Sequence, residues 1–154
     1  MASELSIEDL KENNLIYVGL FKSMYLIDSY YLSSNFTPSP GYHELIHKQS
    51  GDTLRIEGDP GAHHTDYGIL ARISGLNDNM IYVIAGFTDT SVERIISSIT
   101  YPDIASEEME AYIKDAGFPT NFEVVFGVSG YDRKEASNIW IQQCEVLNSG
   151  LSIR

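Results

Sequence analysis

The stretch from Gly58 to Thr90 limits the possible folds of this chain more than any other part of its sequence. Between Tyr67 and Ser74, apolar residues alternate with small or polar ones, which predicts a strand with one buried face. The turn-forming residues Gly75–Asn79 follow and predict a short hairpin connection. Met80–Ala85 is the most apolar run and lacks alternation, as is typical of a central strand covered on both faces. The stretch therefore predicts two antiparallel strands at the centre of a sheet.

A helix is expected directly after this strand pair. Thr90 and Glu93 have the spacing of a capping box, in which each side chain bonds the backbone N–H of the other residue. The apolar positions that follow recur at helical spacing and predict the buried stripe of this helix. They are Val92, Ile95, Ile96 and Ile99.

The start of the chain predicts a second strand and a second helix. Leu15–Leu20 is a short apolar run rich in strand formers, which predicts a buried strand. Ser23 can cap a helix after it. The apolar positions of that helix are Met24, Ile27 and Tyr31. A strand followed by a helix is the first half of a parallel α/β unit.

The C-terminal half continues the alternation of helices and strands. A helix is predicted to begin at Asp103, with an acidic solvated side, and to stop at Gly117. Residues from Phe122 to Val128 alternate as a strand, and Asn138 to Leu147 predicts the last strand. Period-two alternation places two residues of this last strand on one face, Trp140 and Cys144.

These elements predict a single α/β domain over residues 1–154. A length of 154 residues fits one domain with a full core. We expect one mixed β-sheet of Rossmann-like or flavodoxin-like character with helices packed on it. Residues 1–13 predict a short solvated leader helix, with Ser6 and Asp9 at capping-box spacing. Residues 148–154 are expected to form a frayed tail.

Charge and composition exclude several classes of protein. The formal net charge of -12 excludes nucleic acid as a direct partner, because phosphate binding needs a basic surface. No apolar run approaches the roughly 20 residues of a membrane helix, and the N-terminus lacks the regions of a signal peptide. The single cysteine, Cys144, excludes an internal disulfide framework. We therefore expect a cytoplasmic protein.

One catalytic motif occurs in the chain, the HExxH pattern of His43, Glu44 and His47. On a helix, this pattern places two imidazoles one turn apart to hold zinc, while the glutamate activates a metal-bound water. Here the flanking Pro40-Gly41 and Ser50-Gly51-Asp52 leave little room for a helix. They favour a β-hairpin instead, in which the two histidines lie too far apart for one metal ion. A zinc-dependent hydrolase remains an alternative to a metal-free protein.

Three segments are predicted to converge on one edge of the sheet. The hairpin places the start of the Tyr67–Ser74 strand beside the end of Met80–Ala85. A parallel first strand would end at the same edge. Ligands of open α/β sheets bind outside the carboxyl ends of parallel strands, and helix N-termini there favour anions. We therefore expect a small anionic ligand at this edge. The candidate residues are Gly19, Lys22, Ser23, His63, His64, Asp66, Tyr67, Gly86, Thr88 and Thr90. The alternative is that Asp59 and Asp66 cap turns and that the histidines are surface residues.

The same residues carry a resemblance to a known domain. The segments GDTLRIEGDPGAHHTDYGILARISGLNDNMIYVIAGFTDT and LIYVGLFKS resemble an uncharacterised domain found at the C-terminal end of bacterial, often Bacteroidota, regulatory proteins. The matching marks are Gly-Leu-Phe-Lys ending a strand, Asp-Tyr-Gly entering one, a Gly-Asn turn and Ala-Gly-Phe leaving the central strand. The resemblance covers most of residues 14–147 and implies a sensor or regulatory module joined to another domain. It also implies a hairpin for HELIHKQSGDTLRI.

Three functions follow from these observations. The first is a non-catalytic module of a bacterial regulatory protein that binds a small ligand without a cofactor. The second is the zinc hydrolase built on His43, Glu44 and His47. The third is a protein-interaction or dimerisation domain, because the chain has ten tyrosines and tyrosine is enriched at interfaces. A homodimer or a fused regulatory domain is expected as a protein partner.

Overall fold

The computed structural model describes residues 6–58, 62–131 and 136–151. Within these ranges, Leu26 is described by its backbone alone. Five strands form the main sheet in the order β1-β6-β5-β7-β8. Their bounds are β1 (Leu15–Leu20), β5 (His64–Ser74), β6 (Met80–Gly86), β7 (Phe122–Gly130) and β8 (Asn138–Val146). β1 runs parallel to β6, and the other neighbouring strands are antiparallel.

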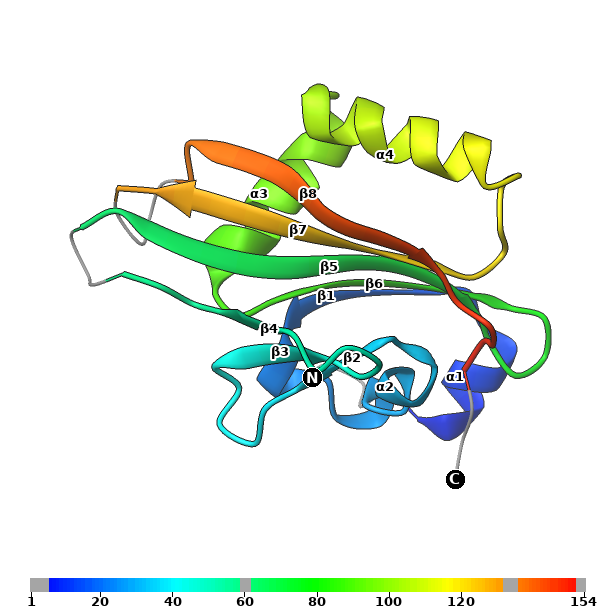
Figure 1. Ribbon diagram of the computed structural model, residues 1–154. Coiled ribbons are helices and arrows are strands. Elements are labelled where there is room, and N and C mark those ends of the chain that lie inside the picture. Colours follow the sequence, from blue (N-terminus) through cyan, green and yellow to red (C-terminus); the bar gives the residue numbers. More distant parts are fainter. Residues whose placement is uncertain (1–5, 59–61, 132–135, 152–154) are drawn as a thin grey trace.

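Two helices cover one face of the main sheet, as Figure 1 shows. α3 (Asp89–Thr100) packs over β6 and β5, and α4 (Ile104–Asp115) packs over β8. The core beneath them includes Ile95 and Phe126, whose side chains are fully buried. Asp103 caps α4 in a capping box with Ser106, which stabilises the helix start. None of the helices in the described ranges is long and apolar enough to cross a membrane.

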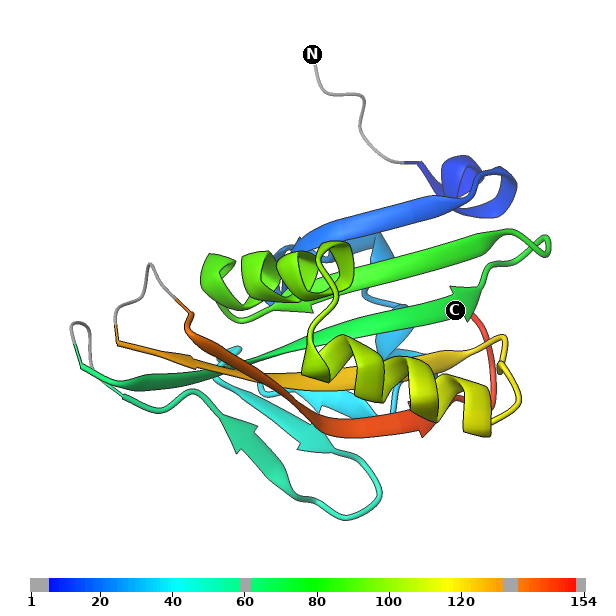
Figure 2. The same ribbon diagram turned by 90° about the horizontal axis from the view of Figure 1, so that it is seen from above.

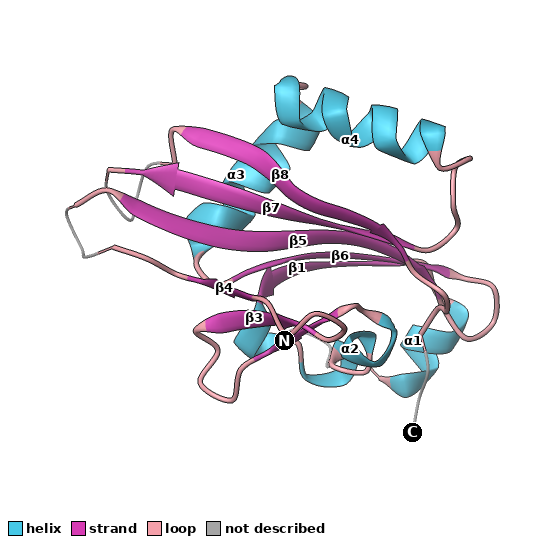
Figure 3. Cartoon of the chain, in the orientation of Figure 1, coloured by secondary structure: helices cyan, strands magenta, loops and turns pink. Residues whose placement is uncertain are grey.

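The opposite face is covered by the N-terminal third of the chain. Figure 3 shows short helical turns and a small antiparallel sheet there, with the strand order β2-β3-β4. The helical pieces are α1 (Ile7–Glu12), the 3₁₀ turns η1 (Phe21–Ser23) and η2 (Tyr25–Ile27), and α2 (Tyr30–Ser33). The strands are β2 (Phe36–Pro38), β3 (Glu44–His47) and β4 (Thr53–Arg55). A second core, which contains Tyr30, Phe36 and Leu45, joins this layer to the main sheet.

The α/β class, the mixed sheet and the central β5–β6 pair agree with the prediction. The connection between the parallel strands β1 and β6 differs from a simple α/β unit, because the small sheet and β5 lie between them in the chain. The helix predicted after Ser23 was wrong. Residues 21–33 form two 3₁₀ turns and one turn of α-helix, and Ser23 lies inside the first turn.

The cap of α3 also differs from the prediction. α3 begins one residue after Thr88, so Thr90 and Glu93 lie inside the helix rather than at its cap. The Thr88 side chain makes no capping bond because its hydroxyl donates to Asp66 instead. Of the predicted stripe, Val92 and Ile95 are buried.

Both ends of the described chain are packed more firmly than expected. α1 has the predicted capping box of Ser6 and Asp9, but its Leu10 is buried in the core rather than solvated. At the other end, the Leu151 side chain is buried, and its N–H donates to the Ser74 carbonyl at 2.7 Å. Residues 148–151 therefore close over the end of β5 instead of fraying, and residues 152–154 lie outside the described ranges.

A β-bulge overturns one prediction for the last strand. The register between β7 and β8 shifts between Val125 and Phe126, where β8 carries one extra residue. Beyond the shift, Trp140 lies opposite Gly127, and its ring occupies the space that a Cβ atom on Gly127 would need. Cys144 lies opposite Val124 and faces the helices. Trp140 and Cys144 therefore lie on opposite faces, because one extra residue reverses the alternation.

Candidate functional site

The three predicted segments meet at one edge of the main sheet. Leu20 at the end of β1 lies opposite Gly86 at the end of β6, and Gly19 lies opposite Ala85. Gly86 also lies opposite Gly68, near the start of β5. The carboxyl ends of the parallel pair and the entry to β5 are thus adjacent, which is the geometry expected for a ligand edge.

The candidate side chains at this edge divide between the two faces of the sheet. A Cβ atom on Gly68 would point at Ile95 of α3, so the even-numbered residues of β5 face the helices. His64 and Asp66 belong to that face, because alternate residues of a strand point the same way. The main chain of Phe21–Ser23 turns toward the small sheet on the other face, where Phe21 is buried beside Phe87 with ring centroids 4.9 Å apart. One predicted site is therefore two separate places.

Asp66 forms the centre of the first place, beneath the start of α3. Its side chain is fully buried and accepts hydrogen bonds from the Thr88 hydroxyl and, at 2.7 Å, from the Tyr67 N–H. Burial raises the pKa of the Asp66 carboxyl, while these hydrogen bonds and the neighbouring His64 oppose the rise. The carboxylate anchors the first turn of α3 to β5.

The two predicted histidines have different environments. His63 is exposed, and its ring packs edge-on against Tyr131 with centroids 5.4 Å apart. His64 is only 7% exposed, and neither ring nitrogen has a hydrogen-bond partner in the part of the chain that the structure describes. A buried polar group without a partner is costly, so His64 is the least satisfied side chain at this edge.

The second place is a hollow of about 280 Å³ at the carboxyl end of β1, which we call the tyrosine hollow. Its lining combines aromatic rings with one cation and one carboxylate. The lining residues are Phe21, Lys22, Met24, Tyr25, Asp28, Tyr31, Thr37, Pro38 and Tyr42. The Tyr31 hydroxyl donates to the Met24 sulfur at 2.9 Å, and burial raises the pKa of Tyr31. Of the predicted site residues, Lys22 lines this hollow.

Two of the lining tyrosines have an unusual backbone. Tyr25 has φ of 36° and Tyr42 has φ of 53°, values that bulky residues adopt only under strain. Both tyrosines line the hollow, and their side chains stay accessible, with Tyr25 79% exposed and Tyr42 40% exposed. Strained residues of this kind concentrate at ligand-binding sites, and here two of them line the same hollow.

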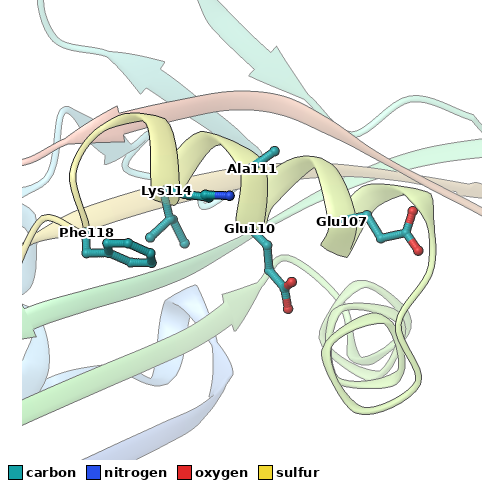
Figure 4. Close-up of a pocket in the computed structure, with 6 residues that line it drawn as sticks. Glu107, Glu110, Ala111, Lys114 and Phe118 are labelled. Atoms are coloured by element: carbon teal, nitrogen blue, oxygen red, sulfur yellow. The ribbon is translucent and has the colours of Figure 1, made fainter.

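A larger hollow of about 470 Å³ lies along α4 and is shown in Figure 4. It is lined by a stripe of α4 and by Phe118, which follows the helix: Glu107, Glu110, Ala111, Ile113, Lys114 and Phe118. Because one helix supplies nearly the whole lining, this hollow is a groove along α4. The tyrosine hollow draws its walls from the 3₁₀ turns after β1, α2, β2 and the loop before β3, so it surrounds a ligand better.

Sequence reasoning missed a buried polar network on the small-sheet face. Glu123 of β7 is 1% exposed. It accepts hydrogen bonds from the Tyr30 hydroxyl at 2.6 Å, the Ser34 hydroxyl at 2.6 Å and the Asn35 N–H at 2.7 Å. Burial raises the pKa of Glu123, and the adjacent Glu145 carboxylate adds to the rise. A charged residue within the apolar run of β7 was the available signal, since a buried charge needs partners.

The HExxH motif lies on strand β3 from Glu44 onward, so the zinc hydrolase alternative lacks the helix it requires. Glu44 and His47 are the ends of β3, and His43 precedes it. The two ring nitrogens of His47 lie 3.0 Å from the Glu145 carboxylate and 2.9 Å from the Ser50 hydroxyl, and Glu44 pairs with Arg55. Within the described ranges, no three His, Cys, Asp or Glu side chains form a group that could hold a metal ion.

Comparison with models of known protein families, with curated proteins and with solved structures finds no match to this chain.

Proposed function

We propose that this protein is a non-catalytic sensory module that binds a small aromatic molecule carrying an anionic group. The observation that carries the proposal is the tyrosine hollow, where Tyr25, Tyr31 and Tyr42 surround a space beside Lys22. Aromatic side chains offer flat faces on which a ring can stack. Lys22 supplies a charge-assisted partner for a phosphate or carboxylate group.

The position of the hollow supports the same proposal. It lies at the carboxyl end of β1, where Rossmann-like and flavodoxin-like sheets bind their ligands. Small-molecule sites combine a mostly apolar or aromatic lining with a few polar groups. Here the charged groups are Lys22 and Asp28, and Asp28 can accept a hydrogen bond from a ring N–H or a hydroxyl.

The hollow also joins two parts of the fold. Its inner wall is the pair of 3₁₀ turns after β1, and its outer wall is Thr37 and Pro38 of β2 with Tyr42. A bound ring would hold the small sheet against these turns and stabilise the folded form by mass action. This coupling suits a cytoplasmic sensor that reports ligand binding to a fused regulatory domain, as the resemblance of the sequence implies.

Binding can be tested by isothermal titration with nucleoside monophosphates and aromatic carboxylates, with adenosine and inorganic phosphate as the two halves of a nucleotide. We expect at least one combined probe to bind more tightly than either half. Lys22→Gln should weaken binding of that probe about tenfold, the loss of one charge-assisted bond, and should leave adenosine binding unchanged.

Two further variants make the test specific to the hollow. Tyr42→Asn should weaken both the combined probe and adenosine, since it removes a ring but keeps a residue that tolerates positive φ. Tyr101→Ala removes a tyrosine that is 76% exposed and lies outside the hollow, and this variant should bind the probes as the parent does. Failure of the whole probe set to bind, or binding that ignores both Lys22→Gln and Tyr42→Asn, would refute the proposed function.

A further inference from the structure

The strand β1 leaves one side of the main sheet open. It lies at the rim of the sheet in Figure 2, and β6 is its only partner strand in the ranges that the structure describes. An edge strand presents a row of N–H and C=O groups to any strand that can pair with it. Edge strands usually carry charges that prevent such pairing, but Leu15–Leu20 contains none.

The same edge exposes large apolar side chains. Ile16 is 72% exposed and Val18 is 48% exposed. Ile16 lies opposite Tyr82 of β6, which is itself 37% exposed. These three residues share the face that carries α3, because residues paired across strands point the same way. The exposed side chains and the unpaired backbone therefore form one continuous surface.

Charge selects the partner that this edge can accept. The chain has a formal net charge of -12, so two copies repel one another over most of their surface. The edge strand is uncharged, and it is flanked by an exposed acid, Glu12, and an exposed base, Lys22. An antiparallel arrangement of two such strands brings the acidic end of each beside the basic end of the other.

We infer that two copies of this chain associate through β1, antiparallel and about a two-fold axis at Tyr17. In that register, Ile16 lies opposite Val18 of the partner subunit, and the two exposed side chains pair on the same face. Leu15 lies opposite Gly19 of the partner subunit. Glu12 is brought toward Lys22 of the partner subunit, and the two-fold symmetry makes each of these contacts occur twice. The result is one continuous sheet across both subunits.

The interface rests on the edge of β1 and is independent of the tyrosine hollow, except that Lys22 takes part in both proposals. An interface made by one strand pair is small, so we expect a dimer that dissociates on dilution. Sedimentation velocity of the full chain over a series of concentrations measures this directly. A single monomeric species at every concentration would overturn the inference.

A pair of variants locates the interface. Ile16→Lys with Val18→Lys places charges on both exposed positions and should abolish the dimer, while circular dichroism confirms that the variant folds. Ile104→Lys changes a residue that is 76% exposed at the start of α4 and should leave the dimer intact. A dimer that survives the double variant would place the interface elsewhere and overturn the inference.

Two experiments test the register. Glu12→Lys should weaken the dimer by opposing Lys22 of the partner subunit, and adding Lys22→Glu should restore it. In a Cys144→Ser background, a mixture of Ile16→Cys and Val18→Cys chains should form a disulfide between different chains, because facing residues of two strands lie within disulfide reach. Each variant alone should cross-link far less. Loss of dimer without recovery in the charge exchange, or equal cross-linking of the single variants, would overturn this register.

Discussion

Two buried carboxylates on opposite faces of the main sheet show how differently polar groups can be accommodated. Glu123 faces the small sheet, and three donors from residues 30–35 bond its two oxygens. Asp66 faces α3 and is also bonded, but the ring of His64 on the same strand face has no partner among the described residues. The first network is complete, and the second contains a polar group that burial leaves unsatisfied.

The difference indicates two roles for buried charge in this fold. Glu123 joins layers that are 88 to 93 positions apart in the chain, and its network specifies how the N-terminal third sits on the sheet. Asp66 fixes the start of α3 over a separation of 22 positions. A complete network stabilises through every member, whereas an incomplete one leaves room for a stabilising substitution.

Glu123→Ala should have the largest effect, a loss of about 3 to 5 kcal/mol in the free energy of unfolding. The substitution leaves two hydroxyls and one backbone N–H buried without their acceptor. Urea unfolding measures the loss. The matched control is Glu145→Ala, at the partly exposed neighbouring position, which should cost clearly less. Equal losses would show that Glu123 is not the centre of the network.

Asp66→Ala should cost about 2 kcal/mol, because Thr88 lies at the partly exposed start of α3 and can bond water instead. Asp66→Asn keeps an acceptor for Thr88 and should cost about half as much. Hydrogen exchange at the N–H groups of the first turn of α3 should rise in Asp66→Ala. Unchanged exchange there would contradict the anchoring role of this carboxylate.

His64→Leu should have the opposite effect and raise the free energy of unfolding by about 1 kcal/mol. The leucine fills the space of the ring and removes two buried nitrogens that lack partners. The exposed neighbour provides the control, since His63→Leu should change stability by less than about 0.5 kcal/mol. Destabilisation by His64→Leu would mean that the ring makes an interaction that its burial alone does not explain.

The smallest effect concerns pH. Burial raises the folded-state pKa of Asp66 above its ordinary value of 3.8. The Asp66 carboxyl therefore keeps its proton to higher pH in the folded state than in the unfolded state. The stability that this proton binding contributes is complete below about pH 3.8 and is lost as pH rises through the folded-state pKa. Urea unfolding should show that the parent exceeds Asp66→Asn in free energy of unfolding, and that this difference narrows as pH rises above about 4. A gap that widens instead would mean that the carboxylate is favoured in its charged form.

Local patterns in the sequence predicted the parts of the fold that local physics decides. The alternation in β5, the turn at Gly75–Asn79 and the apolar run of β6 require only neighbouring residues, and the structure has all three. The convergence of β1, β5 and β6 at one edge follows from them. The β8 bulge could not be seen, because one extra residue leaves the composition of a strand unchanged.

The candidate site was less accessible to prediction than the fold. Lys22 was named, but the tyrosine hollow depends on the left-handed backbone of Tyr25 and Tyr42, which bulky residues rarely adopt. The face to which Lys22 turns depends on 3₁₀ geometry in place of the predicted helix. The Glu123 network joins residues far apart in the chain, and no local pattern records such pairing.

The parallel pairing of β1 with β6 also affects how the protein folds. Leu15 lies opposite Ile81, and because 81 minus 15 is 66, closing this ladder costs much more chain entropy than closing the β5–β6 hairpin. We expect the hairpin to form early and β1 to join the sheet last. Until β1 joins, the edge of β6 that it will cover stays open and apolar. Although β1 is synthesised first, it covers this edge only once the whole sheet has formed, so the growing chain is exposed to aggregation until then.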